Sequence, residues 1–473
     1  MFNYFLLMRK VLTILALIFC EFSFGQPNSF VKFSGPPQLI SYGHGVHQSL
    51  SGSIYLAGYG DDVSTLYSLI SFTKFDEFGS EIDTKYYGDS LHHFMLMRML
   101  AINDNSFLLV GSKMIHGGNN NPYALLIDST GSVIWENSST STLNSWFTGV
   151  SKFPNGNLVF SGAATDTLNG DLNLFGVITD SLGSTLHSFS FGDVGFNETS
   201  ENCLVTNEGT IVVCGDKLIN TSIVNPYVVA FDSTGNYLWD MTIGSHLNSG
   251  SKNLFIDRSN NVIVIGESAT TSSPQFDIQI SKIDVASASV VWMKLLQGTD
   301  MSDAGFALSE TVDGHYVVAG YGHDSIYSTK RVVMIVTDTS GNELSKQYFG
   351  SSPINIGYEI CPSIYGGFLI AGADFVNNQE ILIYQKELGI GIEEVNEFST
   401  SVYPNPISVN SKINFSDPID QFTLLSISGQ LIFSKRFDYP ISSFMLPFIT
   451  SGVYFLELEQ RGKRFQSILT VTE

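Results

Sequence analysis

The residues that could perform chemistry in this chain do not form a recognisable catalytic or metal-binding motif. His44 and His47 have no Glu or Cys partner at a metal-ligand spacing, and a strand would point the neighbours His92 and His93 to opposite faces. No nucleophile elbow, Cys/His pairing or phosphate-binding loop occurs. We therefore assign no catalytic, metal-ligating or cofactor-binding residue from the sequence and expect no cofactor.

The carboxylates are the remaining reactive groups. Single aspartates recur along the chain, each followed by a turn, and they lack the alternating spacing of a calcium loop: Asp76, Asp128, Asp180, Asp232, Asp284 and Asp338. We interpret them as turn caps, since an Asp side chain can accept hydrogen bonds from the backbone amides of its own turn. A pair of carboxylates from distant segments, as glycosidases use, stays open, but no such pair is singled out by the sequence.

The elements that position these residues repeat seven times. An apolar run ends in glycine at intervals of 51 to 54 residues, and the turn aspartates follow at 52 to 54. The recurring glycines are Gly58, Gly111, Gly162, Gly215, Gly266, Gly320 and Gly372. Two independent markers with one period indicate a repeat architecture.

Each repeat has room for four strands and no helix. Asn-Gly and Asp-Gly pairs, as in the segments 154–157 and 312–315, predict tight hairpins after the first strand. The second strand is apolar throughout, which is typical of a strand covered on both faces. Four antiparallel strands in about fifty residues predict the blade of an all-β propeller with seven blades. Trp135, Trp239 and Trp292 recur at one position of the fourth strand, and we expect them to pack between blades.

The seventh repeat lacks its fourth strand, and the mature N-terminus supplies a matching segment. Residues 29–35 resemble the fourth strand at 188–192, and Gly35 precedes Gly88 by one period, 53 residues. We predict that this N-terminal strand closes the ring, which removes an open sheet edge.

The repeats are similar to the secreted bacterial propeller repeats known as delta-sixty or SBBP-like repeats. The likeness is carried by the segments 314–320, Gly-His-Tyr-Val-Val-Ala-Gly, and 232–239, Asp-Ser-Thr-Gly-Asn-Tyr-Leu-Trp. It covers about residues 28–388 and implies the fold more than a function.

A separate C-terminal module follows an acidic linker. Three separated motifs there resemble the type A sorting domain of the type IX secretion system: Tyr403-Pro404-Asn405-Pro406, Gly429, and Gly452-Val453-Tyr454. The resemblance implies a small β-sandwich that the outer-membrane translocon recognises after Sec export. One departure is Gln466-Ser467, where the family commonly has a Lys.

Together these features predict a signal peptide at residues 1–25, a propeller at 26–388, a linker at 389–400 and a sorting domain at 401–473. The signal peptide is indicated by Arg9-Lys10, a short apolar core and a small residue before position 26. That core is too short for a permanent membrane span, and no later stretch is apolar enough for one. Phe19 occupies a position where lipid attachment at Cys20 would need a small residue.

The composition agrees with an extracellular β protein. The formal charge of −22 excludes nucleic acid as a probable partner, because such binding needs clustered Lys and Arg. Three cysteines remain after the signal peptide, Cys203, Cys214 and Cys361. A disulfide between Cys203 and Cys214 is conceivable, but buried free thiols are the favoured interpretation.

The sequence leaves function open between three classes. The first is a secreted or cell-surface binding or adhesion protein, whose glycan or protein ligand meets the long polar loops between repeats. His116, Trp146 and His323 are the candidate residues of that loop face. The second is an extracellular carbohydrate-active enzyme with a carboxylate pair in the central channel. The third is a structural component of the cell surface.

Overall fold

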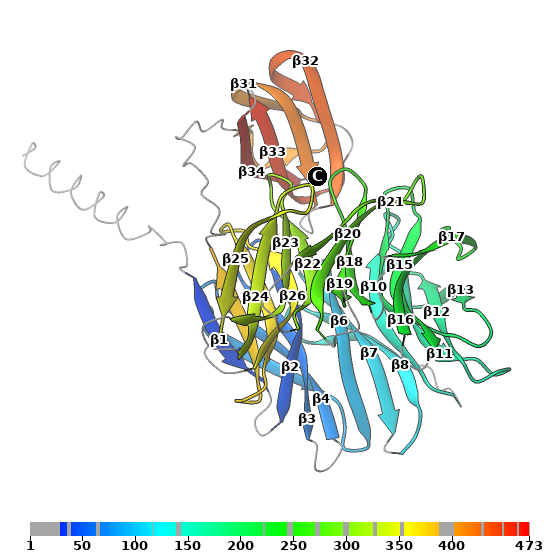
Figure 1. Cartoon of the computed structure of the whole chain (residues 1–473). Coiled ribbons are helices and arrows are strands. Elements are labelled where there is room, and N and C mark those ends of the chain that lie inside the picture. The colour runs from blue at the N-terminus through cyan, green and yellow to red at the C-terminus, as the bar shows by residue number, and fades with distance from the viewer. Residues whose placement is uncertain are drawn as a thin grey trace, which may run out of the picture.

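The computed structural model describes residues 29–35, 39–62, 67–115, 117–138, 143–220, 223–243, 249–269, 275–296, 302–324, 329–350, 354–386, 402–426, 430–446, 449–460 and 463–472. All regular secondary structure in these ranges is β-strand. The predicted signal peptide and linker lie outside them. The strands form seven four-stranded sheets arranged as a ring, with a separate C-terminal sheet above one side of it (Figure 1).

The first four blades follow one another along the chain. Blade 1 contains β2 (Ile40–Gln48), β3 (Ile54–Asp62), β4 (Tyr67–Phe75) and β5 (Glu81–Tyr87). Blade 2 contains β6 (His92–Asn103), β7 (Ser106–Ile115), β8 (Asn120–Asp128) and β9 (Val133–Ser138). Blade 3 contains β10 (Ser145–Lys152), β11 (Leu158–Thr165), β12 (Leu172–Thr179) and β13 (Thr185–Phe191). Blade 4 contains β14 (Asn197–Val205), β15 (Ile211–Asn220), β16 (Ile223–Phe231) and β17 (Tyr237–Thr242).

The last three blades complete the ring. Blade 5 contains β18 (Ser249–Ile256), β19 (Val262–Ser268), β20 (Asp277–Asp284) and β21 (Ser289–Leu296). Blade 6 contains β22 (Ala304–Glu310), β23 (Tyr316–Asp324), β24 (Thr329–Thr337) and β25 (Glu343–Phe349). Blade 7 contains β26 (Asn355–Pro362), β27 (Phe368–Asp374), β28 (Gln379–Gln385) and, from the other end of the chain, β1 (Phe30–Ser34). The predicted all-β propeller with seven blades is confirmed.

The N-terminal strand closes the ring as predicted. β1 pairs antiparallel with β28, with Phe30 opposite Tyr384 and Ser34 opposite Glu380. The ring of Phe30 also lies against Gly79 of blade 1, where a side chain would collide with it. The edge of β28 is therefore covered by a strand from the opposite end of the propeller sequence.

The turn aspartates cap turns, as predicted. In blade 4, Asp232 Oδ1 accepts hydrogen bonds from the amides of Thr234 and Asn236, at 2.8 and 3.0 Å. The side chains of Asn236 and Thr234 also donate to this carboxylate, and these side-chain bonds, with the backbone bonds, lower the pKa of Asp232. Gly235 completes the turn with φ of +90°, a conformation that glycine adopts without strain.

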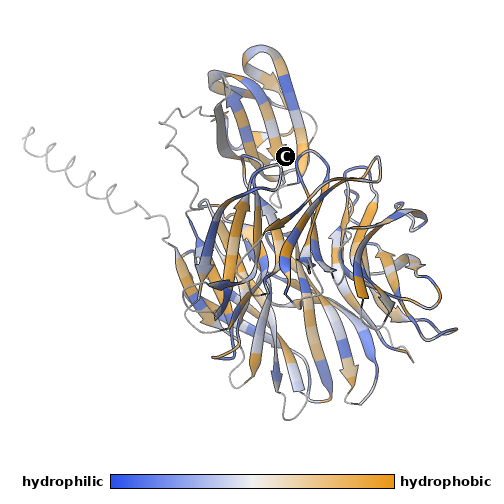
Figure 2. Ribbon diagram, viewed as in Figure 1, coloured by the Kyte–Doolittle hydropathy of each residue, from blue (hydrophilic) through white to orange (hydrophobic). Residues whose placement is uncertain are grey.

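Aromatic residues of the fourth strand pack against the next blade. Trp135 of blade 2 lies against Gly183 of blade 3, and Trp292 of blade 5 lies against Gly341 of blade 6. Phe189 has the same relation to Gly235, between blades 3 and 4. The strands carry most of the hydrophobic residues, as Figure 2 shows, and the second strands are almost fully buried. The recurrent tryptophans therefore stabilise blade contacts, as expected.

Each blade has two different ends, because its four strands alternate in direction. The hairpin turns between first and second and between third and fourth strands lie on one face, here called the turn face. The loops between second and third strands and the links between blades lie on the opposite face, the loop face.

The structure describes Cys203 and Cys214 as buried free thiols, which confirms the favoured interpretation.

The C-terminal domain is a single barrel-like sheet. It contains β29 (Val402–Tyr403), β30 (Ile407–Ser408), β31 (Lys412–Leu425), β32 (Leu431–Met445), β33 (Gly452–Gln460) and β34 (Lys463–Thr472), in the order β29-β31-β33-β34-β30 with β32 beside β31. The sheet encloses a core of its own, which includes Ile413, Phe422 and Leu456. Tyr403 of the predicted sorting motif is 51% exposed, whereas Gly429 lies outside the described residues.

Candidate binding site at the centre of the ring

The first strand of every blade carries a β-bulge at the same position. The pairing of first and second strands shifts by one residue there, as between Gly43 and Gly45 in blade 1 and between Ser200 and Asn202 in blade 4. The seven extra residues, here called the bulge residues, are His44, Met97, Thr148, Glu201, Lys252, Phe306 and Tyr358. A bulge redirects a side chain out of the normal alternation, and it often does so beside functional sites.

Side chains from neighbouring first strands meet around the central axis. The ring of His44 stacks on that of Tyr358 across blades 1 and 7, with centroids 4.6 Å apart. Tyr358 in turn meets the edge of Phe306 in blade 6 at 5.3 Å. Strands of consecutive blades approach one another in this way only where the blades converge, so the bulge residues surround the centre of the ring.

An arginine crosses this centre. Arg98, next to the bulge of blade 2, donates a hydrogen bond from Nη2 to the carbonyl oxygen of Lys252 in blade 5 at 2.9 Å. Its Nη1 lies 3.1 Å from Oε2 of Glu359 in blade 7. These partners belong to blades that do not adjoin blade 2. Arg98 therefore links blades 2, 5 and 7 across the axis.

One side of the centre is aromatic. Blades 1, 6 and 7 contribute six rings, here called the aromatic half: Tyr42, His44, Tyr59, Phe306, Tyr321 and Tyr358. Burial, and then the charge of Arg98, lower the pKa of His44 to about 3, so its imidazole is neutral. Burial raises the pKa values of Tyr59 and Tyr358, which keeps both phenols protonated. This half offers flat, uncharged ring faces with hydroxyl groups at their edges.

The other side is charged. Blades 4 and 5 contribute Glu201, Asp216, Lys252 and Glu267, here called the charged half. Lys252 Nζ lies 3.7 Å from Oε1 of Glu267. Asp216 Oδ1 accepts a hydrogen bond from the amide of Ser251 at 2.8 Å, which fixes it beside the same lysine.

Two carboxyls of the charged half, those of Glu201 and Asp216, titrate near neutral pH. Burial raises the pKa of Glu201 to about 7, with Asp216 and Glu267 acting in the same direction and Lys252 opposing. Burial likewise raises the pKa of Asp216 to about 6. Burial disfavours the charge of Lys252, but the three carboxylates outweigh it and raise its pKa. Strongly perturbed carboxyls around one lysine are a common feature of functional sites.

Solvent reaches both halves. The side chains of Lys252 and Glu267 are 22% and 24% exposed, and those of Arg98 and Glu359 are 13% and 19% exposed. Apart from the buried Tyr59, the glutamate, lysine and aromatic side chains at the centre are half-buried. Because Asp216 and Glu267 follow the recurring glycines of second strands, which run towards the loop face, the site lies on that side of the bulges.

A Ser, His and Asp group in blades 1 and 2 is not a catalytic triad. Ser68 Oγ lies 2.7 Å from Nδ1 of His93, and Asp61 Oδ1 lies 3.6 Å from the same nitrogen. A triad needs the serine and the carboxylate on different ring nitrogens. Ser68 is fully buried, and its hydroxyl donates to the carbonyl of Phe94. The group therefore joins two blades.

The described residues contain no group of three or more His, Cys, Asp or Glu side chains that could hold a metal ion. Within the same part of the chain, there is also no helix with the length and apolar character needed to cross a membrane.

The structure places two of the three loop-face candidates. Trp146 is half-buried on β10, the first strand of blade 3, opposite Ala163. His323 is a buried residue of β23, and its Nδ1 lies 3.4 Å from Oδ1 of Asp303. Its ring also meets Tyr321 of the aromatic half at 6.4 Å. His116 lies outside the described residues, and the three candidates are not brought together as one group.

Sequence reasoning missed the bulge residues, although a signal for them exists. Each lies fourteen residues before the recurring glycine of its repeat, as His44 does before Gly58 and Glu201 does before Gly215. This position holds a different residue type in every blade. A search for repeated residues discards such a position, whereas alignment of the repeats on their glycines exposes it.

Comparisons with known proteins support the fold and the C-terminal domain. Residues 401–471 match the family described as secretion system C-terminal sorting domain. No curated protein matches the chain. A catalytically inactive virginiamycin B lyase from Staphylococcus aureus, solved with quinupristin, has 10% identity and a TM-score of 0.50, and the match covers 76% of this chain and all of that one.

Two further solved structures are similar at lower scores. A protein of unknown function from Dyadobacter fermentans has 12% identity and a TM-score of 0.45 over 66% of this chain and 96% of that one. An α-L-arabinofuranosidase from Fusarium graminearum, in complex with an iminosugar inhibitor, has 9% identity and a TM-score of 0.43 over 66% and 98%. Identities this low carry no functional assignment. The chain is a seven-bladed β-propeller protein with a type IX secretion system C-terminal sorting domain, which directs it to secretion or to attachment at the cell surface.

Proposed function

We propose that this protein binds an extracellular glycan at the centre of its propeller, on the side of the loop face. The observation that carries the proposal is the pairing of an aromatic half with a charged half, both within reach of solvent. Sugars present flat C–H faces and hydroxyl edges. The rings of Tyr358 and His44 can stack on the C–H faces, and Lys252 with its carboxylates can form hydrogen bonds with the hydroxyl groups. Apolar walls with a few convergent polar groups are typical of small-molecule sites.

The position of the site fits a protein displayed outside the cell. The sorting domain lies on the turn face of the ring, where its residues share a cavity with Asp313 and Thr339 from hairpin turns of blade 6. The loop face is the opposite end of the blades. A ligand that approaches the loop face therefore does not meet the sorting domain.

Glycan-array binding by three variants of the full chain would test the proposal. Tyr358→Ala removes a ring of the aromatic half, and Glu201→Gln removes a charge of the other half at nearly constant shape. Both should weaken binding about tenfold or more, since each removes a central contact. Leu168→Ala is the control, because Leu168 is 92% exposed in a loop of blade 3. Binding that survives both central changes but is lost in the control would place the ligand on the loops and refute the proposal.

A second candidate function is a glycoside hydrolase that uses the carboxyls of the charged half. It is favoured by the pKa of Glu201, raised to about 7 by burial, and that of Asp216, raised to about 6. A protonated carboxylic acid beside a carboxylate is the acid–base arrangement that glycosidases need. Turnover of polysaccharides, lost separately in Glu201→Gln and Asp216→Asn, would support this candidate. Glycan binding without turnover would leave only the binding function.

A further inference from the structure

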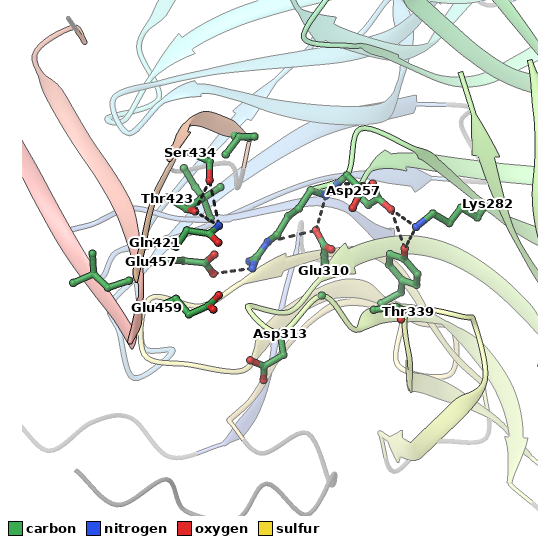
Figure 3. A pocket seen from close by; sticks show the side chains of 17 residues that line it. Asp257, Lys282, Glu310, Asp313, Thr339, Gln421, Thr423, Ser434, Glu457 and Glu459 are labelled. Carbon is green, nitrogen blue, oxygen red and sulfur yellow. Dashed lines mark hydrogen bonds and ion pairs between the residues drawn. The ribbon is translucent and has the colours of Figure 1, made fainter. Parts of the chain in front are cut away.

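The sorting domain contacts the propeller through a half-buried arginine. Arg258, in the turn between β18 and β19 of blade 5, places Nη1 2.7 Å from Oε1 of Glu457 in β33 of the sorting domain. A second contact joins Gln430 Nε2 to Oδ1 of Asn207, in the corresponding turn of blade 4, at 3.1 Å. Figure 3 shows Glu310 of the propeller and Glu457 of the sorting domain in the lining of one pocket.

The propeller holds this guanidinium in place independently of the sorting domain. Its Nη1 donates to the carbonyl of Val312, and its Nε lies 3.6 Å from Oε2 of Glu310. The backbone amide of Arg258 also donates to Glu310 at 3.2 Å. The neighbouring Asp257 is fixed by Lys282 at 2.7 Å. Because these contacts already hold the guanidinium of Arg258, little conformational entropy is lost when the carboxylate of Glu457 binds it.

The matching face of the sorting domain is buried although it points away from that domain's own core. In β33, Leu456 and Leu458 belong to the core, so Glu457 between them points to the opposite side. Glu457 is nevertheless only 7% exposed, and Thr423, its partner across β31, is also 7% exposed. Both line a cavity of about 290 Å³ shared with Arg258. The propeller thus covers a polar sheet face that an isolated sorting domain would present to solvent.

Chain connectivity does not by itself produce this contact. The segment 387–401 joins the domains, and about fifteen residues can span up to roughly 50 Å when extended. Its length therefore allows many positions of the sorting domain. The contact at Arg258 selects one of them.

We propose that the turn face of blades 4 to 6 is a docking surface for the chain's own sorting domain, with Arg258 as its anchor. The docked arrangement covers the sheet face around Glu457. It leaves the sorting motif accessible, since Tyr403 is 51% exposed. The propeller thereby presents the motif to the secretion machinery in a fixed orientation.

The contact is also built to be released. Glu310 and Glu457 share one guanidinium, Glu310 at Nε and Glu457 at Nη1. Burial, together with the nearby carboxylates, raises the pKa of Glu310 to about 7. When the sorting domain separates from the propeller, the repulsion between the carboxylates of Glu457 and Glu310 is lost. The polar cavity between the domains keeps the interface open to water, which is typical of weak, reversible contacts.

Small-angle scattering of the full chain tests the docking. Arg258→Met keeps the length of the side chain without its charge, and Glu457→Gln is nearly isosteric. Each should raise the ratio of separated to docked molecules about tenfold or more, seen as a larger radius of gyration. The control is Arg436→Met, which removes the partner of Glu459 inside the sorting domain. It should leave the radius unchanged.

The double variant decides whether the two residues act as a pair. Arg258→Met with Glu457→Gln should expand the chain no more than either change alone, because both remove one shared interaction. Thermal unfolding of each variant checks that both domains remain folded. A native chain that is already expanded, two single variants that stay compact, or expansion that is fully additive in the double variant would each overturn the proposal.

Discussion

Replacement of Glu380 by glutamine should stabilise the closed ring, and increasingly so as the pH rises. Glu380 lies on β28 opposite Ser34 of the closing strand, and it is fully buried. The hydroxyl of Ser71 in blade 1 donates to its Oε1. Its Oε2 has no hydrogen-bond partner among the described residues. The carboxyl is thus enclosed where the two ends of the propeller meet.

Burial raises the pKa of Glu380 to about 8, from the ordinary 4.5. The folded chain therefore retains a proton between about pH 4.5 and 8 that the unfolded chain has lost, so stability falls as pH rises through this window. At roughly 1.36 kcal/mol per pKa unit, the full difference is about 5 kcal/mol well above pH 8 and about 1 kcal/mol at pH 5. Glutamine resembles the protonated acid and escapes this cost.

Thermal unfolding at a series of pH values measures the effect. A ring of roughly 360 residues has an unfolding entropy near 0.75 kcal/mol/K, so the gain in Tm should grow by about 5 °C between pH 5 and pH 9. Glu136→Gln is the control, because Glu136 is an exposed residue of blade 2. A difference in Tm between Glu380→Gln and the native chain that stays constant over this pH range would refute a buried carboxyl at the closure.

Three further predictions concern the ring and its centre. Deletion of residues 26–36 removes β1 and should lower the Tm of the whole propeller; an unchanged transition would contradict closure by this strand. Ala124→Val extends into a cavity of about 100 Å³ between blades 2 and 3 and should raise the free energy of unfolding by up to about 1.5 kcal/mol. The corresponding increase in Tm is about 2 °C, and a decrease would show that the space is already filled. Glycan affinity should change between pH 6 and 8 in calorimetric titrations as Glu201 ionises, and Glu201→Gln should abolish that change.

The fold was predictable because every blade packs against its neighbour in the same way. The glycines, turn aspartates and fourth-strand tryptophans recur since each blade needs the same turn and the same contact with its neighbour. The closing strand was predictable for the same reason: Phe30 packs on Gly79 as Trp135 packs on Gly183. Periodicity alone carries this information.

The central site was not predictable in the same way. Arg98 and Glu359 are 261 residues apart in the chain, and only closure of the ring brings them together. The bulge residues differ from blade to blade, so no period marks them. The burial of a loop-face candidate was likewise not predictable from the sequence. The sequence around His323 predicts a polar loop, whereas His323 is a buried residue near the end of β23.

The contact between the two domains could not be predicted from the sequence period of the repeats or from the sorting-domain motifs. Arg258 and Glu457 are 199 residues apart, and each lies in a segment whose local pattern is explained without the other. The turn of Arg258 is an ordinary hairpin, and β33 alternates between core and surface. Only the burial of Glu457 on the outer side of its sheet reveals that something covers it.

The direction of the strands keeps the two proposed sites apart. A four-stranded antiparallel blade puts both hairpin turns at one end, and seven such blades make one uniform face of short turns. Such a face offers fixed backbone positions, as the contact of Arg258 with the carbonyl of Val312 illustrates. It therefore suits the sorting domain, which is a constant part of the chain. The centre of the ring is different, because each blade contributes one side chain that the scaffold leaves free to vary. Substitutions at the bulge residues can therefore change the ligand without disturbing the docking surface for export.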